Sequence, residues 1–181
     1  MSTKLVADIA LSQRPIKGLK PKAWIFNAGE VTITKTDNKI TNLVKVAGKK
    51  AFTVEGFKDF MNAGFEPFIA ENMPNSFKHI FTLQYNAATA AEKANIDNVD
   101  NIIVIVEKNA GCDTSEGAFL AYGICNGLWK TAQSKKANDN NGMATVEFAT
   151  REGQGETYSE YVVWKTDYAT TLAALVAAET V

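Results

Sequence analysis

Apolar runs separated by short polar turns dominate the second half of the chain, and they predict β-strands. Three of them lie at 101–107 (NIIVIVE), 118–125 (AFLAYGIC) and 143–150 (MATVEFAT), joined by segments that contain Gly and Asn. Three strands connected in this way indicate an antiparallel meander. Residues 102–106 have no polar position, which is typical of a central strand covered on both faces. We therefore expect the rest of the chain to pack around this strand.

Alternating polar and apolar residues predict further strands before and after this meander. The clearest alternation is at 77–85 (FKHIFTLQY), where one face carries Phe77, His79, Phe81, Leu83 and Tyr85. Residues 159–165 (SEYVVWK) predict the last strand. In the first third of the chain we expect strands at 22–26, 31–35, 40–46 and 51–54. The first of these turns at 27–29 to meet the second, so that a hairpin or meander forms.

Two segments have clear helix signals. Thr89 and Glu92 have the spacing of a capping box in an alanine-rich helix at 87–96, for which we expect Asn86 to be the cap. The alanine face of this helix should lie close on a sheet. A C-terminal helix starts at Asp167, and its apolar face consists of Tyr168, Leu172, Leu175 and Val176.

A third, short helix is predicted near residue 60. Phe57, Phe60 and Met61 fall at helical spacing, and Gly64 follows as a stop. Another short turn is expected from Pro67 to Asn72. The phenylalanines of this region require burial, and an aromatic stripe of this kind is typical of a core.

Length and composition indicate one globular domain. The chain has 181 residues, 46% hydrophobic and 22% charged, which allows a core of its own and argues against wholesale disorder. Residues 1–21 predict an extended N-terminal arm, because Pro15 and Pro21 cannot donate to a sheet. We expect a single β-rich domain at 22–181. The sequence shows neither a membrane-spanning run of about 20 apolar residues nor a secretory signal, so we expect a chain made in a cytoplasm.

Charge is unevenly distributed along the chain. Residues 1–60 contain eleven Lys and Arg against five Asp and Glu, a net of +6, and residues 61–181 contain eight against fifteen, a net of −7. Such charges either lie on solvated faces of one domain or face each other between copies. Nucleic-acid recognition is disfavoured, because the pI is about 5.9 and the N-terminal lysines lack interleaved aromatic residues.

The residues capable of nucleophilic or metal chemistry form no motif. His79 is the only histidine and lies in a predicted strand, where a hydrogen-bonded structural role is favoured. Cys112 and Cys125 lie on separate elements without the spacing of zinc ligands, and in a cytoplasmic chain we expect them to be reduced. The sequence contains no nucleophile elbow, phosphate loop or dinucleotide-binding glycine motif. We expect no metal ion and no cofactor.

Carboxylates are the only candidates for hydrolytic chemistry. They are Glu152, Glu156 and Glu160, close together in sequence, and Asp97, Asp100 and Asp113 beside turns. A glycosidase needs two carboxyl groups at a defined separation across a cleft, and exposed acidic loops explain these residues more simply. Residues 138–142 (NDNNG) lack the spacing of a calcium-binding loop and predict a turn. We therefore expect no enzyme, and we assign no catalytic, cofactor-binding or metal-binding residue.

One succession of strands and turns between residues 77 and 165 is distinctive. The strand at 102–106 leads to Tyr122, Gly123, Gly127 and Leu128, then to the asparagine-rich turn at 138–142 and a long strand that ends at Thr150. This order resembles the major tail (tail tube) proteins of tailed bacteriophages and prophages, in particular those of Bacteroidetes phages.

The resemblance implies a β-rich α+β fold, an antiparallel β-sandwich or partial barrel with one flanking helix and a C-terminal helix. It also implies a virion structural protein, assembled in the bacterial cytoplasm, whose copies form stacked hexameric rings. The rings build a tube through which DNA passes as non-specific cargo. Its partners are then other copies and other tail or connector proteins, with no membrane. We expect the arm at 1–21 to contact neighbouring copies.

Three other functions differ in class. The first is another virion ring, connector or head-decorating protein. The second is a ligand-binding β-sandwich module with a stacking platform of Trp24, Trp129 and Trp164, although core or interface positions are favoured for these residues. The third is an enzyme that uses the acidic loop at 152–160. The sequence leaves open the oligomer number, the presence of a contractile sheath and the lumen-facing residues.

Overall fold

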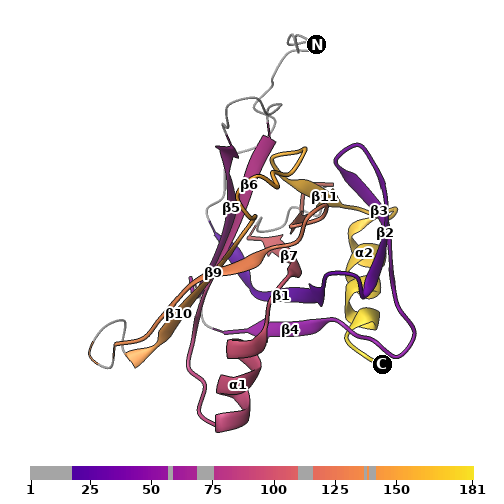
Figure 1. Ribbon diagram of the computed structural model, residues 1–181. Helices are drawn as coiled ribbons and strands as arrows, with labels where there is room; N and C mark the ends of the chain where they lie inside the picture. The colour runs from indigo at the N-terminus through magenta and orange to yellow at the C-terminus, as the bar shows by residue number, and fades with distance from the viewer. Residues whose placement is uncertain (1–17, 57–58, 69–75, 110–115, 137, 139–141) are drawn as a thin grey trace.

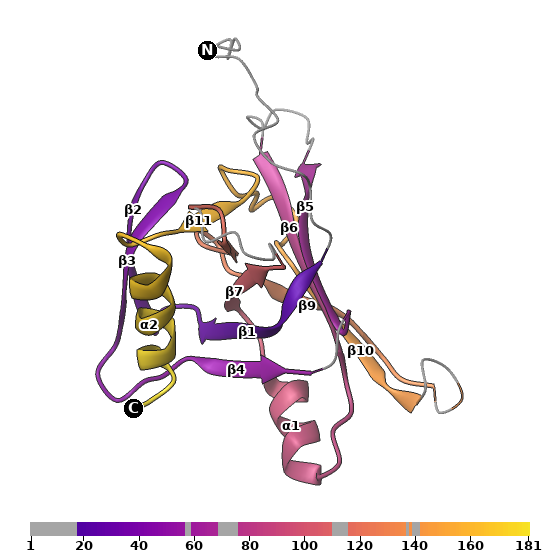
Figure 2. The same ribbon diagram turned by 180° about the vertical axis from the view of Figure 1, so that it is seen from behind.

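The computed structural model describes residues 18–56, 59–68, 76–109, 116–136, 138 and 142–181. They form eleven strands and two helices, arranged around two sheets that face each other (Figures 1 and 2). The strands are β1 (Leu19–Asn27), β2 (Val31–Thr36), β3 (Lys39–Lys45), β4 (Phe52–Glu55), β5 (Met61–Phe68), β6 (Ser76–Tyr85), β7 (Ile102–Lys108), β8 (Phe119–Tyr122), β9 (Trp129–Ser134), β10 (Ala144–Ala149) and β11 (Tyr161–Val163). The helices are α1 (Ala90–Asn98) and α2 (Tyr168–Ala178).

The larger sheet has seven strands in the order β2-β3-β11-β8-β7-β1-β4. Its neighbours are antiparallel except for β11 and β3, which run parallel. In β7, every residue from Ile102 to Glu107 is buried. Val104 and Val106 belong to the cluster between the sheets, whereas Ile103 and Ile105 belong to a second cluster on the other face. The prediction of a central strand covered on both faces is therefore confirmed.

The smaller sheet has four strands in the order β5-β6-β10-β9. The predicted alternation of β6 is confirmed, because His79, Phe81 and Leu83 are buried and the residues between them are only half-buried. The predicted meander is wrong in its third strand, since β10 leaves β7 and β8 and pairs with β6 and β9. A strand with one apolar face fits either sheet, so its partner is decided by long-range pairing rather than by its own pattern.

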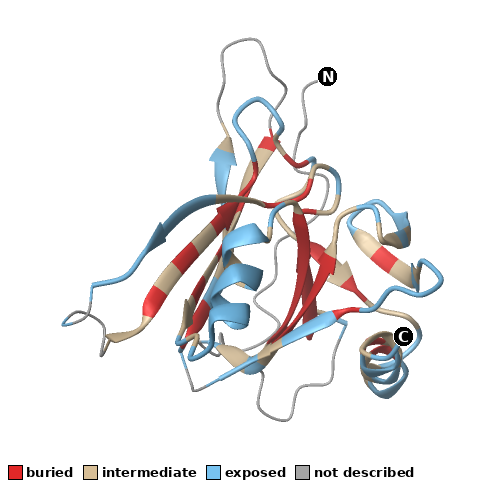
Figure 3. Ribbon diagram, turned by 60° about the horizontal axis from the view of Figure 1, so that its bottom comes forward, coloured by how far each residue is buried: buried red, intermediate tan, exposed pale blue. Residues whose placement is uncertain are grey.

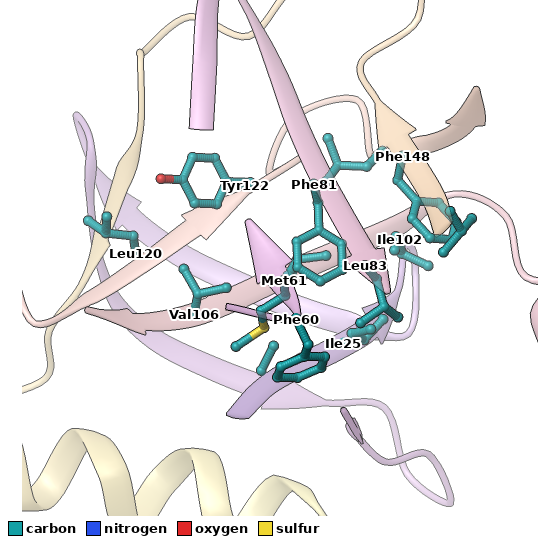
Figure 4. Close-up of a cluster of buried hydrophobic side chains, with 14 residues drawn as sticks. Ile25, Phe60, Met61, Phe81, Leu83, Ile102, Val106, Leu120, Tyr122 and Phe148 are labelled. Atoms are coloured by element: carbon teal, nitrogen blue, oxygen red, sulfur yellow. The ribbon is translucent and has the colours of Figure 1, made fainter. Parts of the chain in front are cut away.

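A hydrophobic cluster fills the space between the two sheets (Figure 4). Phe81 and Phe148 from the smaller sheet stack with ring centroids 6.5 Å apart. They meet Ile25 and Ile102 from the larger sheet, and Met61 of β5 joins the same cluster. This burial is the main source of stability for a sandwich, since apolar area removed from water is worth roughly 25 cal/mol per Å².

Helix α2 covers the opposite face of the larger sheet, where Leu175 is buried against that second cluster. Asp167 is the N-cap, as predicted, and accepts from the Thr170 N–H at 2.7 Å. The predicted apolar face is wrong at Val176, which is 46% exposed. Thr171 is buried instead, and its hydroxyl is satisfied there because it donates to the Asp167 carbonyl at 2.7 Å and accepts from the Lys165 N–H at 3.1 Å.

Helix α1 is almost wholly exposed and buries no residue (Figure 3). Its capping box is confirmed, because the Thr89 hydroxyl accepts from the Glu92 N–H at 3.2 Å and the Glu92 carboxyl accepts from the Thr89 N–H at 3.0 Å. The cap is therefore Thr89 and not Asn86. The expectation that its alanine face lies close on a sheet is wrong. The sequence AAEKANIDN has no apolar stripe that would hold it there.

The short helix predicted at 57–64 is also wrong. Residues 61–68 form β5, with Pro67 in the strand, and Phe57 and residues 69–72 lie outside the described residues. Eight register pairs with β6 hold β5 in place, so tertiary pairing overrides the local helical spacing of Phe60 and Met61.

The first third of the chain pairs differently from the expected hairpin or meander. The hairpin of β2 and β3 is confirmed. Strand β1, however, lies between β7 and β4 and does not pair with β2. It begins at Leu19, within the segment assigned to the N-terminal arm, and residues 1–17 of that arm lie outside the described residues. With these corrections, the predicted β-rich α+β sandwich with one flanking and one C-terminal helix is confirmed.

Candidate functional site

Glu156 is the residue whose position was least expected. It is fully buried, although it lies in a polar loop that was predicted to be exposed. Its two carboxyl oxygens accept from the Cys125 N–H, at 3.1 Å each, and one of them also accepts from the Asn126 N–H at 3.1 Å. The Tyr161 hydroxyl donates to it at 3.3 Å. The carboxyl group thus fastens the turn at 123–128, which connects the two sheets.

His79 holds the same turn from β6. Its Nδ1 accepts from the Gly123 N–H at 3.1 Å, so the proton lies on Nε2, which donates to the Tyr158 carbonyl at 2.9 Å. Burial lowers the pKa of His79 below its usual value, although the nearby Glu156 opposes this. The predicted hydrogen-bonded position of His79 within a strand is confirmed by these contacts, and the side chain is fully buried. We call His79, Glu156 and the turn at 123–128 the clasp.

Two further side chains, Tyr161 and Lys35, lie beside the Cys125 thiol of the clasp. Cys125 Sγ lies 3.1 Å from the Tyr161 hydroxyl and 3.5 Å from Lys35 Nζ. Burial raises the pKa of Tyr161, so this phenol stays protonated and serves as a donor. Cys125 is exposed and free, and Cys112 lies outside the described residues. Each polar atom of Glu156 and His79 therefore binds the protein itself, which is an arrangement for holding two loops together.

Glycines explain how the sequence permits the clasp. Gly123 has φ of +75° and Gly127 has φ of +71°, a conformation that L side chains rarely adopt. A Cβ atom at Gly155 would lie 2.3 Å from Ser76 Oγ, so only glycine lets the Glu156 loop lie against β6. Gly123 and Gly127 are among the residues that carry the resemblance stated above. In the sequence, the glycines just before Glu156 are the signal from which a tightly packed loop could have been predicted.

The other carboxylates are not gathered around one cleft. Glu152 is exposed and Glu160 is half-buried, accepting from the Tyr122 hydroxyl at 3.3 Å. Asp97 and Asp100 lie near the end of α1, and Asp113 is outside the described residues. The described residues contain no group of three or more His, Cys, Asp and Glu side chains placed to hold a metal ion. Neither helix of the described part is long and apolar enough to cross a membrane.

The three tryptophans do not form an exposed platform. Trp24 is 1% exposed in the core, and its Nε1–H donates to Glu179 at 2.8 Å. Trp129 is half-buried and stacks with Arg151, whose Cζ lies 3.3 Å from the ring centroid. The stacking platform of the ligand-binding alternative therefore lacks Trp24. In the turn at 138–142, Gly142 has φ of +76°, and residues 139–141 lie outside the described ones.

The smaller sheet has two open edges. Among the described strands, only β6 pairs with β5 and only β10 pairs with β9. Residues 131–134 of β9 are exposed, and Phe65 of β5 is 44% exposed. The face that points away from the core carries the polar residues Lys78, Thr82, Thr145 and Glu147 together with Ile80. Unpaired N–H and C=O groups along such an edge are a template for pairing with another chain.

A groove of about 880 Å³ opens between α1 and the edge strand β4. Residues 50–55 line one wall without interruption, and Ile96 and Val99 contribute to the other. Its floor is the end of the core, with Leu83, Ile102 and Phe148. The clasp closes one opening between the two sheets, and this groove leaves another one open.

Comparison with protein-family models, with curated proteins and with solved structures finds no match to the chain.

Proposed function

We propose that this chain is a phage virion structural protein whose copies assemble into stacked rings that form a tail tube. The pair of open edges on the smaller sheet carries the proposal. If β9 of one copy pairs with β5 of the next, the sheet continues from copy to copy. A repeated head-to-tail contact of this kind closes into a ring when its rotation permits.

Polar side chains on the outer face of the smaller sheet support the proposal that this face lines the lumen of the tube. Glu66 of β5 lies opposite Lys78 of β6, and the Thr131 hydroxyl donates to Glu147 at 2.9 Å. The lysine at position 78 on this face therefore has a carboxylate on the neighbouring strand. A surface of this kind offers few free cations to phosphate groups, so DNA can pass as non-specific cargo.

The resemblance to tail-tube proteins supports the same function. The partners that follow from it are other copies of the chain and other tail or connector proteins. The location is the virion, after assembly in the cytoplasm of the bacterial host. No catalytic step is part of this function, and the contacts of His79 and Glu156 support a structural role for both residues.

Negative-stain electron microscopy of the concentrated, purified protein tests the proposal. We expect hollow filaments of uniform diameter. Closed rings of fixed number that never stack would favour a connector, and a monomer at every concentration would contradict self-assembly altogether.

A variant pair separates edge pairing from general surface effects. Phe65→Glu places a charge on the open edge strand β5, where the side chain is 44% exposed, and should prevent filament formation. Val44→Glu changes a side chain of β3 that is 53% exposed and should assemble as the unmodified chain does. Circular dichroism checks that both variants are folded. If Phe65→Glu forms normal filaments, β5 is not part of the contact.

A further inference from the structure

The groove between α1 and β4 has the features of a site for an added β-strand. Strand β4 is the last strand of the larger sheet, and among the described strands only β1 pairs with it. Consecutive residues from Lys50 to Glu55 line the groove, so the strand turns its free edge toward it. An extended segment binds such an edge through main-chain hydrogen bonds, while its alternate side chains enter the space beside it.

Helix α1 has little support from the other described residues. It has nine residues and buries none of them, whereas isolated helices shorter than about 12–15 residues are marginal in water. Its described supports are the capping box and contacts at its end, where Lys130 Nζ donates to the Ile96 carbonyl at 3.2 Å and Gln133 donates to Asp97 at 2.7 Å. A segment lying in the groove would complete the packing of the half-buried Ile96 on the inner side of α1.

The lining of the groove sets the chemistry of the occupant. Its apolar floor requires apolar side chains at every second position of an extended segment. Four acidic residues line it, Glu55, Glu92, Asp100 and Glu179, against the single lysine Lys50. Lys22 offsets part of this charge, since it pairs with Glu55 at 3.0 Å and with Glu179 at 2.8 Å. A segment with basic residues at its ends is therefore complementary to the rim.

One segment of the chain has this pattern. Residues 4–11 read KLVADIAL, in which alternate positions are Leu5, Ala7, Ile9 and Leu11. Residues 1–17 carry Lys4, Arg14 and Lys17 against Asp8 alone. We propose that residues 4–11 of a second copy bind in the groove as a strand added to β4. This inference rests on the proposed self-assembly, and it names a contact separate from the open edges of the smaller sheet.

Photo-cross-linking of the full chain tests this contact. Ile9 is replaced by p-benzoylphenylalanine, and equal amounts of ¹⁴N- and ¹⁵N-labelled protein are mixed, irradiated under assembly conditions and analysed by mass spectrometry. We expect cross-links from position 9 to peptides that cover 50–55 or 92–100, with one light and one heavy partner. Cross-links within one chain only, or to other parts of the surface, would overturn the proposal.

A matched pair of variants makes the result specific. Phe52→Lys combined with Ile96→Lys should lower the yield of these cross-links about tenfold, which corresponds to ~1.4 kcal/mol of lost binding. Val176→Lys changes a side chain as exposed as Phe52, 46% against 45%, but away from the groove, and should leave the yield unchanged. An unchanged yield in the double variant would also overturn the proposal. Filaments without these cross-links contradict the groove contact alone, whereas a monomer without them contradicts the proposed function as well.

Discussion

The two openings between the sheets differ, since the clasp closes one and the groove leaves the other open, although β6 contributes residues to both. At the clasp, His79 and Glu156 are fully buried, and each of their polar groups has a partner within the same chain. At the groove, Leu83 forms part of the floor. Helix α1 contributes to one wall of the groove and has no buried residue. Buried polar groups cost free energy unless they are paired, so the clasp must be complete in a single copy. The groove has an apolar floor and, among its described lining residues, no buried polar group of this kind, so it can stay open in a single copy.

The largest expected effect is at Glu156, which tests whether the clasp is essential to one copy. Glu156→Ala leaves the Cys125 and Asn126 N–H groups and the Tyr161 hydroxyl without their buried acceptor. We expect the free energy of unfolding to fall by about 3 kcal/mol, measured by urea denaturation. The exposed Glu152→Ala is the control and should change it by less than ~0.5 kcal/mol. Equal effects of the two substitutions would show that the clasp contributes little.

His79 should come next. His79→Phe keeps a ring beside Tyr122, whose centroid lies 5.2 Å away, but removes both hydrogen bonds of the imidazole. The Gly123 N–H and the Tyr158 carbonyl lose their partners, which should cost about 2 kcal/mol. Lys78→Ala on the outer face of the same strand is the control, and we expect little change from it in the same denaturation experiment.

A smaller, pH-dependent effect should also come from His79. Because burial lowers the pKa of His79, the unfolded chain takes up a proton at higher pH than the folded one. The stabilisation is therefore complete above about pH 6.5 and is lost as the pH falls from there to the folded pKa. The groups that face His79 are Glu156, Glu160, Tyr122 and Tyr161. Unfolding free energies at about pH 7 and about pH 5 should differ less in His79→Phe than in the unmodified chain; an identical difference would assign the pH dependence to other groups.

The smallest expected effect on one copy is at α1, which tests the open side of the comparison. Thr89→Ala removes the hydroxyl of the capping box and should weaken the helix by about 1 kcal/mol. The global free energy of unfolding should change by less than ~0.5 kcal/mol, because α1 buries no residue and opens locally. Hydrogen exchange of the α1 amides should accelerate while exchange in β7 does not. Equally accelerated exchange in α1 and β7 would contradict a helix that opens independently of the core.

Sequence reasoning succeeded where a feature is encoded within a few neighbouring residues. The apolar run of β7, the alternation of β6, the hairpin of β2 and β3, the capping box of Thr89 and Glu92 and the cap at Asp167 can all be recognised from neighbouring residues. It failed for 61–68, because the pairing of β5 with β6 outweighs the helical spacing of two residues. It also failed for the candidate site, since a glutamate in a glycine-containing loop has the same local pattern whether it is exposed or buried.

The sequence by itself determined that this protein is β-rich, which segments form most of its strands and that two segments form helices, the second of them starting at Asp167. Only the tertiary structure decided that β10 joins the smaller sheet, that Glu156 is buried and that α1 has no buried residue. The reason is physical: a local pattern specifies which side of an element is apolar, but not what covers it. His79 meets Gly123 at a separation of 44 residues and Thr150 at 71, and contacts over such separations exist only once the two sheets have come together.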